Sequence, residues 1–336
     1  MKLVETLLVR DEADIIAEHL DYHLGAGVDY VIATDHRSQD GTTEILESYA
    51  RAGALRLIRK EEEFTRENEW QTEMARLAAT EYGADWVVNS AADEFWYPRG
   101  PSLKDVLGAV PSEFAIVRGL VRNFLPLQDD AGWFAERMTV RLAGDAPIND
   151  PATPFRPVVK VAHRAHPDVS VSGGHMVYGL SGALLTAWYP LEVLHLPLRS
   201  REQCARKYRK TWTGWNENLR GDLARARQAS DEGRLDPVWD RVALDDSARK
   251  RGLAARSLVS DTRLRDAFRT LRDDRVPSAA MSKQRGFEPS IDAELVPHAL
   301  DVSVFEEAEL VRYQRWVDEL GARVQRLARN QRLGLL

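Results

Sequence analysis

The sequence predicts an α/β fold with a mostly parallel sheet flanked by helices, followed by a helical C-terminal region. Short apolar runs alternate with helix-like runs between residues 2 and 90. Polar segments follow the apolar runs, at the positions where a parallel sheet binds ligands. The composition, with 44% apolar and 29% charged residues in a chain of 336, is typical of a globular protein.

The alternation defines the order of the predicted elements. Strands are predicted at 2–9, 28–34, 54–58 and 85–90, with helices between them and the last helix at 67–82. Asp11 is the predicted N-cap of the first helix. Alternation of this kind implies right-handed crossovers and a parallel sheet, so a ligand site is expected beyond the carboxyl ends of the strands.

The remainder of the chain changes character after these elements. Residues 113–196 form short strand-like runs and loops rich in Pro and Gly, which we expect to cap the sheet. Beyond Leu196 the pattern is helical, beginning with a capping box of Ser200 and Gln203. A final helix at about 304–327 is predicted to pack on the body or on the second subunit of a homodimer.

Charge and cysteine content exclude several classes of function. The net charge of -6 argues against a dedicated nucleic-acid binder, which usually presents a basic face. Cys204 is the only cysteine, so neither an internal disulfide nor a cysteine-based zinc site can form, and a cytoplasmic location is expected. The apolar segment 1–9 is too short for a secretory signal or a membrane span.

Two carboxylates, Asp93 and Glu94, follow the apolar run 86–88 at the predicted sheet edge. Oxygen ligands at a strand end suit a hard divalent cation such as Mg or Mn, which can bridge a diphosphate. The alternative is a solvated acidic turn, because strand ends are often polar.

Four segments in order along the chain resemble parts of family-2-like glycosyltransferases of the GT-A fold. They are Arg10-Asp11-Glu12, the Asp-x-x-Ser-x-Asp-Gly-Thr pattern of residues 35–42, the Asp-x-Asp-Glu-Phe-like element of residues 89–96, and His195-Leu196-Pro197-Leu198-Arg199-Ser200 with Gln203 and Lys207. Each motif is weak alone, but their shared order over about two thirds of the chain is fairly specific.

The resemblance implies a GT-A-like, Rossmann-like catalytic domain over residues 1–198 and a helical region over 199–336. It implies transfer of a sugar from a nucleoside diphosphate sugar, of the UDP or GDP class, to a hydroxyl of a saccharide or other acceptor, with inversion. The implied nucleotide-sugar site consists of Val9, Arg10, Asp35, Arg37, Ala91, Asp93, Arg199 and Lys207.

Individual roles follow from the same resemblance. Val9, Arg10 and Asp35 would line the base pocket, and Arg37 would stack or reach phosphate. Asp93 and His195 would hold the metal, His195 being alternatively a phosphate contact. Arg199 and Lys207 would clamp the pyrophosphate, because positive groups offset the charge that develops on the leaving group.

Ala91 departs from the family pattern, because the first Asp of Asp-x-Asp is expected at this position. Three interpretations stay open: a site adapted to a different donor, an introduced substitution that cripples the enzyme, and a naturally impaired binder.

A base for the acceptor hydroxyl is expected in residues 160–175. Asp168 and His175 are the predicted catalytic residues, with His163 and His166 as further candidates. For each of them a loop histidine or a solvated carboxylate is the alternative.

Two other functions compete with sugar transfer. A nucleotidyltransferase usually carries a Gly-rich loop after its first strand, and Arg10-Asp11-Glu12 contains no glycine. A non-catalytic sugar-nucleotide or glycan-binding protein is favoured only by Ala91.

Overall fold

The fold comes from a computed structural model, and the structure describes residues 1–63, 65–100, 102–143, 158–185, 190–210, 232, 239–240 and 242–273. The predicted helix at about 304–327 lies outside these residues.

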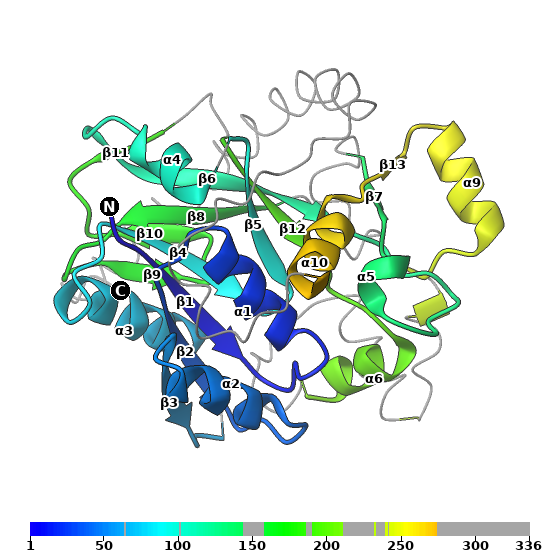
Figure 1. Ribbon diagram of the computed structural model, residues 1–336, viewed down its shortest axis with the longest axis horizontal. Helices are drawn as coiled ribbons and strands as arrows, with labels where there is room; N and C mark the ends of the chain where they lie inside the picture. The colour runs from blue at the N-terminus through cyan, green and yellow to red at the C-terminus, as the bar shows by residue number, and fades with distance from the viewer. Residues whose placement is uncertain are drawn as a thin grey trace, which may run out of the picture.

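A mostly parallel sheet of nine strands forms the centre of the molecule (Figure 1). Its order is β3-β2-β1-β4-β8-β6-β12-β5, with β11 paired to β6. The strands are β1 (Leu3–Val9), β2 (Tyr30–His36), β3 (Leu55–Lys60), β4 (Trp86–Ala91), β5 (Glu94–Pro98), β6 (Phe114–Asn123), β8 (Val159–Arg164), β11 (Ala183–Leu184) and β12 (Leu191–His195). The predicted sheet is confirmed, with the first four strands in their predicted places.

Strand directions decide where polar side chains can meet. β1, β2, β3 and β4 are parallel to one another, and β8 is antiparallel to both β4 and β6. Because β4 and β6 are both antiparallel to β8, they run in the same direction, and β12 shares that direction because it is parallel to β6. The carboxyl ends of β1, β2, β3, β4, β6 and β12 therefore share one edge of the sheet, which we call the carboxyl edge.

Helices cover both faces of this sheet. The helices are α1 (Ile16–Gly25), α2 (Thr42–Arg51), α3 (Glu67–Thr80), α4 (Leu103–Gly108), α5 (Phe134–Arg137), α6 (Arg201–Lys210), α9 (Asp246–Ala254) and α10 (Arg263–Asp273). One face packs against α1, α4 and α10, and the other against α3 and the hairpin of β9 (Ser170–Ser172) and β10 (Met176–Tyr178). In the described residues beyond Leu198, the structure adds to the helices one strand that the sequence does not predict, β13 (Leu258–Ser260). This strand pairs with β7 (Val140–Leu142).

Asp11 is not the N-cap of the first helix, so this prediction is wrong. α1 begins at Ile16, and Asp11 has a φ of 56°. Its carboxylate accepts a hydrogen bond from the amide of Gln39 at 2.6 Å. Asp11 therefore belongs to the loop that joins β1 to α1, where a short polar side chain tolerates a left-handed backbone.

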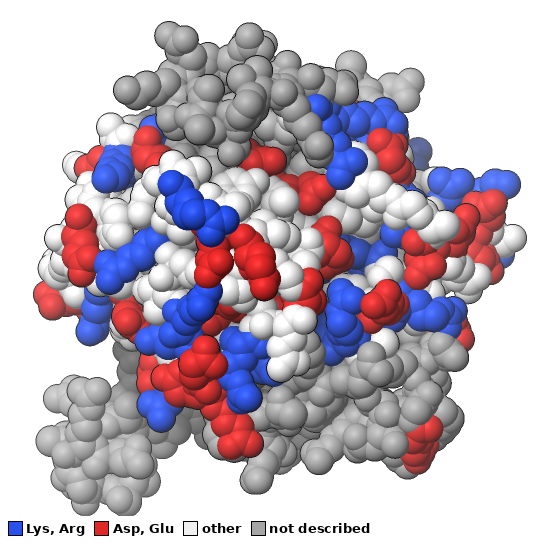
Figure 2. All heavy atoms as spheres, turned by 60° about the horizontal axis from the view of Figure 1, so that its bottom comes forward, with Lys and Arg blue, Asp and Glu red and all other residues white. Residues whose placement is uncertain are grey.

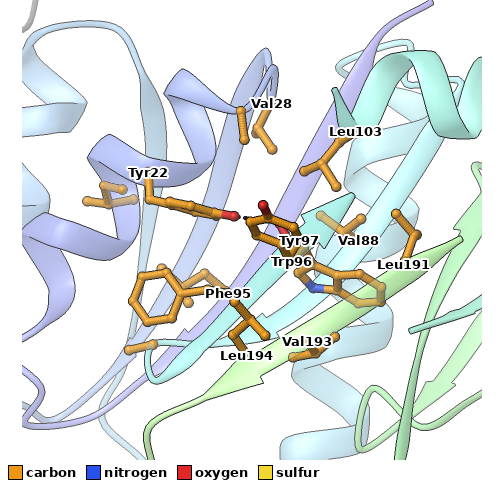
Figure 3. Close-up of a cluster of buried hydrophobic side chains, with 14 of the residues drawn as sticks. Tyr22, Val28, Val88, Phe95, Trp96, Tyr97, Leu103, Leu191, Val193 and Leu194 are labelled. Atoms are coloured by element: carbon orange, nitrogen blue, oxygen red, sulfur yellow. Dashed lines mark hydrogen bonds between the residues drawn. The ribbon is translucent and has the colours of Figure 1, made fainter. Parts of the chain in front are cut away.

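The core on the α1 face is built around the aromatic strand β5 (Figure 3). Phe95, Trp96 and Tyr97 are three consecutive aromatic residues, and all three are buried. The Tyr22 ring of α1 meets Phe95 edge-on at 5.4 Å, and its hydroxyl donates to the Trp96 carbonyl at 3.3 Å. These contacts fix β5, and therefore the turn that precedes it, against α1.

Surface charges are mixed on the face shown in Figure 2, where Lys and Arg side chains of the described residues lie beside Asp and Glu. Among the ion pairs at the protein surface, Lys60 and Glu73 lie 2.7 Å apart. Exposed pairs of this kind contribute little to the free energy of unfolding, so the buried pairs described below carry more weight.

His163 of β8 gives the fold a predictable response to pH. The side chain is fully buried, and burial lowers its pKa to about 4. Between about pH 6.5 and 4 the unfolded chain binds a proton there that the folded chain does not, so stability falls as the pH falls through this range. His163→Leu is expected to remove up to about 2 kcal/mol of the stability difference between pH 7.5 and 5, measured by urea unfolding.

The exposed His166 provides the control for this measurement. His166→Leu is expected to leave the difference between the two pH values unchanged. An equal difference in wild type and His163→Leu would show that His163 is not held neutral by burial.

Candidate functional site

Polar residues from several strands meet at the carboxyl edge. The register aligns Val9 of β1 with Asp35 of β2, and Leu8 of β1 with Ala91 of β4. It also aligns His195 with Asn123 at the ends of β12 and β6. The directions in Figure 1 thus bring residues that are far apart in sequence to one candidate site.

The motif of residues 35–42 joins the first two loops of this edge. The backbone amides of residues 11–13 donate to Ser38 Oγ at 2.9 Å, Thr42 Oγ1 at 2.8 Å and Asp40 Oδ2 at 3.1 Å. Gly41 has a φ of 99°, a conformation that side chains disfavour. The motif therefore satisfies the amides of an irregular loop that precedes α1.

Asp35 supports its own loop. Its two carboxylate oxygens accept from Ser38 Oγ at 2.6 Å and from Thr43 Oγ1 at 2.5 Å. The other residues predicted for the base pocket lie at the same edge, with Val9 buried, Arg10 partly exposed and Arg37 exposed. Their contact with a nucleotide base stays a prediction.

Arg199 is buried at the centre of this edge. Its guanidinium binds both oxygens of Asp14, at 2.7 and 2.9 Å, and also contacts Glu12 and the Leu196 carbonyl. Burial acts to lower the Arg199 pKa, but Glu12 and Asp14 outweigh it and raise the pKa. Arg199 therefore joins the β1–α1 loop to the segment after β12, and its predicted role as a pyrophosphate clamp would require these pairs to open.

Asp93 lies in the turn between β4 and β5 and is bound by two basic side chains. Lys207 Nζ of α6 donates to Asp93 Oδ2 at 2.6 Å, and His195 Nε2 lies 3.5 Å from the same oxygen. The other ring nitrogen of His195 donates to Asn123 Oδ1 at 2.7 Å. Burial acts to raise the Asp93 pKa, but Lys207 and His195 hold it well below its usual value. Asp93 is therefore an anion.

Both carboxylate oxygens of Glu94, the neighbour of Asp93, have partners within the protein. One oxygen accepts from the Ala91 amide at 3.0 Å, and the other lies 3.0 Å from Lys160 Nζ. Lys160 also donates to the Gly173 carbonyl at 3.1 Å. Glu94 and Lys160 are both buried, so this pair anchors the β4–β5 turn to the loop between β9 and β10.

The structure separates the two predicted catalytic residues. His175 Nδ1 donates to the carbonyl of Val159, the first residue of β8, which lies toward the carboxyl edge. Asp168 follows the end of β8, where Arg164 pairs with Trp86 at the start of β4. Asp168 is therefore exposed at the opposite edge and is not brought to Asp93.

His175 is partly buried beside Lys160. Burial and the Lys160 charge lower its pKa to about 4, so the ring is neutral at pH 7. Because Nδ1 carries the hydrogen donated to Val159, the lone pair is on Nε2. His175 could thus accept a proton.

Among the described residues, one group of three side chains has the spacing of a metal site: Glu5, His19 and His23. His23 Nδ1 lies 2.9 Å from the His19 carbonyl, and its Nε2 accepts from the Trp96 amide at 3.1 Å. Nδ1 therefore carries the hydrogen, and neither nitrogen of His23 offers a free lone pair.

This group instead holds the turn that carries Asp93. His19 lies 3.1 Å from the Ala92 carbonyl and 2.9 Å from Glu5, while His23 accepts from Trp96. Burial acts to raise the Glu5 pKa, but the two histidines outweigh it and lower it. Helix α1 therefore contacts the backbone on both sides of Asp93, at Ala92 in the turn and at Trp96 in β5.

The carboxyl edge itself fits a divalent cation poorly. Among the residues that the structure describes, Asp93 is the one carboxylate paired with His195, and Lys207 already occupies one of its oxygens. Ala91 offers no ligand, and Glu12 and Asp14 are paired with Arg199. Divalent ions prefer several oxygen ligands, so the residues present do not form the predicted Mg or Mn site in this arrangement.

Several site residues were missed by sequence reasoning. They are Glu12, Asp14, Asn123 and Lys160. A lysine inside the apolar run of residues 158–162 is a signal that could have found Lys160, because lysine is rarely buried without a partner. The others lie in polar loops or at a strand end, where the sequence does not distinguish a partner from a solvated side chain.

The fold and this edge define an α/β protein with a polar site beyond its parallel strands. Residues 4–113 match the model of glycosyltransferase family 92, and this match supports a glycosyltransferase. It covers about a third of the chain, from β1 to α4, and includes Asp35 and Asp93. The sequence motifs predicted a glycosyltransferase that resembles family 2. The match supports a glycosyltransferase, while the likeness to family 2 and the roles assigned to the motifs stay predictions.

Solved structures similar to the chain include two proteins crystallised with a uridine nucleotide. S. aureus TarS 1–349 in complex with UDP-GlcNAc is 12% identical, with 76% of each chain covered and a TM-score of 0.35. Glucosyl-3-phosphoglycerate synthase from Mycobacterium tuberculosis, in complex with Mn2+, UDP and glucosyl-3-phosphoglycerate, is 22% identical over 37% of this chain and 43% of that chain, with a TM-score of 0.26. No curated protein matches the sequence.

The helices in the described part of the chain are all too short or too polar to cross a membrane.

The Arg199 pairs make a testable contribution to stability. Arg199→Ala leaves Glu12 and Asp14 without their shared partner and is expected to reduce the free energy of unfolding by about 3 to 5 kcal/mol. Arg66→Ala breaks an exposed pair with Glu69 and is expected to change it by less than about 0.5 kcal/mol. Urea unfolding measures both. A loss below 1 kcal/mol for Arg199→Ala would mean that these pairs do not form.

Proposed function

We propose that the protein transfers a sugar from a nucleoside diphosphate sugar to an acceptor hydroxyl, with inversion. The observation that carries the proposal is the charged site around Asp93 at the carboxyl edge, within a sheet whose first four strands match a glycosyltransferase family. Ligands of open parallel sheets bind at this edge. The donor would be of the UDP or GDP class.

The donor would bind across the loops that follow β1, β2 and β4. Val9, Arg10, Asp35 and Arg37 would surround the base and ribose, and the diphosphate would lie near Ala91 and Asp93. Lys207 would supply positive charge there, and Arg199 would add to it once its pairs with Glu12 and Asp14 open; positive charge favours a leaving diphosphate.

The reaction exchanges one bond for another. The acceptor oxygen bonds to the anomeric carbon while the bond from that carbon to the phosphate oxygen breaks. The electron pair of the broken bond leaves with the nucleoside diphosphate. The hydroxyl proton passes to a base, and His175 is the candidate, because its Nε2 is unprotonated at pH 7.

The substitution Asp93→Asn tests whether Asp93 belongs to the site, and Asp168→Asn is the matched control. Loss of the charge is expected to reduce both donor binding and turnover at least roughly tenfold, because Lys207 and His195 lose the anion that orients them. Asp168→Asn, exposed at the opposite edge, is expected to leave both unchanged. Release of nucleoside diphosphate from a panel of UDP- and GDP-sugars measures turnover, and calorimetry measures binding.

Equal effects of the two substitutions would remove Asp93 from the site. Donor binding without turnover across the whole panel would favour a non-catalytic sugar-nucleotide-binding protein, the alternative that Ala91 supports.

His175→Gln tests the base. Turnover is expected to fall roughly a hundredfold while donor affinity stays within about threefold, since the ring acts on the acceptor and not on the donor. Kinetics and donor titration check the two quantities separately. Loss of donor affinity with unchanged turnover would assign His175 to the donor side.

A further inference from the structure

We propose that the ammonium group of Lys207 takes the place of a divalent cation beside Asp93, so that donor binding does not require a metal. The inference rests on the proposed function, because it concerns the diphosphate of the same donor. Three features of the carboxyl edge support it.

The first feature is the ligand set. Ala91 removes the carboxylate expected two residues before Asp93, and Glu94 is committed to Lys160 and to the Ala91 amide. With Glu12 and Asp14 paired to Arg199, a divalent ion would have Asp93 and the ring of His195 as its ligands among the described residues. Hard cations bind weakly to so few anionic oxygens.

The second feature is the seating of Lys207. Its Nζ lies 2.6 Å from Asp93 Oδ2 and 3.1 Å from the Pro197 carbonyl. Gln203 Nε2 donates to the same carbonyl at 3.4 Å, and its Oε1 accepts from the Arg199 amide at 3.1 Å. The start of α6 is thereby tied to the segment after β12, and Lys207 is held over Asp93 before any donor binds.

The third feature is charge. Asp93 carries one negative charge and Lys207 one positive charge at hydrogen-bond distance. A divalent ion on Asp93 would either expel Lys207 or lie close to it, and like charges at that separation repel strongly. The ammonium can instead face the diphosphate while it stays bound to Asp93, because lysine binds phosphate as a compact point charge.

The experiment compares donor-product binding with and without metal. The protein is treated with EDTA, and binding of UDP and of GDP is measured by calorimetry in EDTA and in MnCl2. The dissociation constant of whichever nucleotide binds is expected to differ by less than about threefold between the two conditions. Electron paramagnetic resonance of Mn2+ added to the nucleotide-free protein is expected to show no ion bound at micromolar concentrations.

Two variants assign the effect to Lys207. Lys207→Met is expected to weaken nucleotide binding at least tenfold in EDTA. Lys104→Met, which breaks an ion pair with Asp29, is the matched control and is expected to change nothing. The double variant Ala91→Asp with Lys207→Met restores a carboxylate and removes the ammonium, so it is expected to bind nucleotide at least tenfold better in MnCl2 than in EDTA. Circular dichroism and thermal unfolding establish that each variant is folded.

The outcomes separate this inference from the proposed function. Wild-type binding that weakens more than tenfold in EDTA overturns the inference and leaves sugar transfer standing. Unchanged binding in a folded Lys207→Met variant also overturns the inference alone. Failure of the wild type to bind UDP or GDP under both conditions overturns the proposed function, and the inference with it.

Discussion

The buried guanidinium of Arg199 joins the first loop of the chain to the segment that leaves the sheet after β12. Asp14 and Glu12 meet it from one side and the Leu196 carbonyl from the other. Charges removed from water at this depth are tolerated only when paired and hydrogen-bonded. The positions of His195 and Lys207 depend on this contact, because both flank Arg199 in sequence and both reach Asp93.

Helix α1 supplies the second constraint. Its two histidines contact the backbone at Ala92, in the β4–β5 turn, and at Trp96, in β5, so the turn is held from within the core as well as from β12. This arrangement places the carboxylate of Glu5 in the middle of a face of β1 that is otherwise apolar. Glu5 Oε1 lies 2.9 Å from His19 Nε2 and 3.6 Å from His23 Nδ1, and these contacts offset part of the cost of burying the carboxylate.

The sequence predicted the sheet well because its signal is periodic. The four strands β1 to β4 and the three helices between them, which lie between Leu3 and Ala91, follow directly from the apolar pattern and the glycine breaks. The candidate site was predicted in part: the motifs located Asp93, His195 and Lys207, which the structure brings together. The prediction did not show that Lys207 binds Asp93, because a side-chain pair 114 residues apart leaves no local pattern.

Other parts of the site could not be read from the sequence for a related reason. Asp168 and His175 are only seven positions apart, yet the β9–β10 hairpin places them toward opposite edges of the sheet. Their separation depends on β8 running antiparallel to β4, a property of strand order that neither periodicity nor spacing reveals. Asp11 is likewise a residue type that commonly caps helices, but here it adopts a left-handed backbone conformation in a loop.

The helix that bears Lys207 has a consequence for how the chain can be shortened. A division after Leu198, suggested by the change from strand-like to helical sequence, would keep every strand of the central sheet. It would also discard both cations that neutralise Asp93, Glu12 and Asp14. A fragment ending there would hold three neighbouring anions at the end of its sheet, and their mutual repulsion would oppose folding. We therefore expect a folded fragment to need α6 as well as the strands of the sheet, because α6 carries Lys207 and Arg199 immediately precedes it.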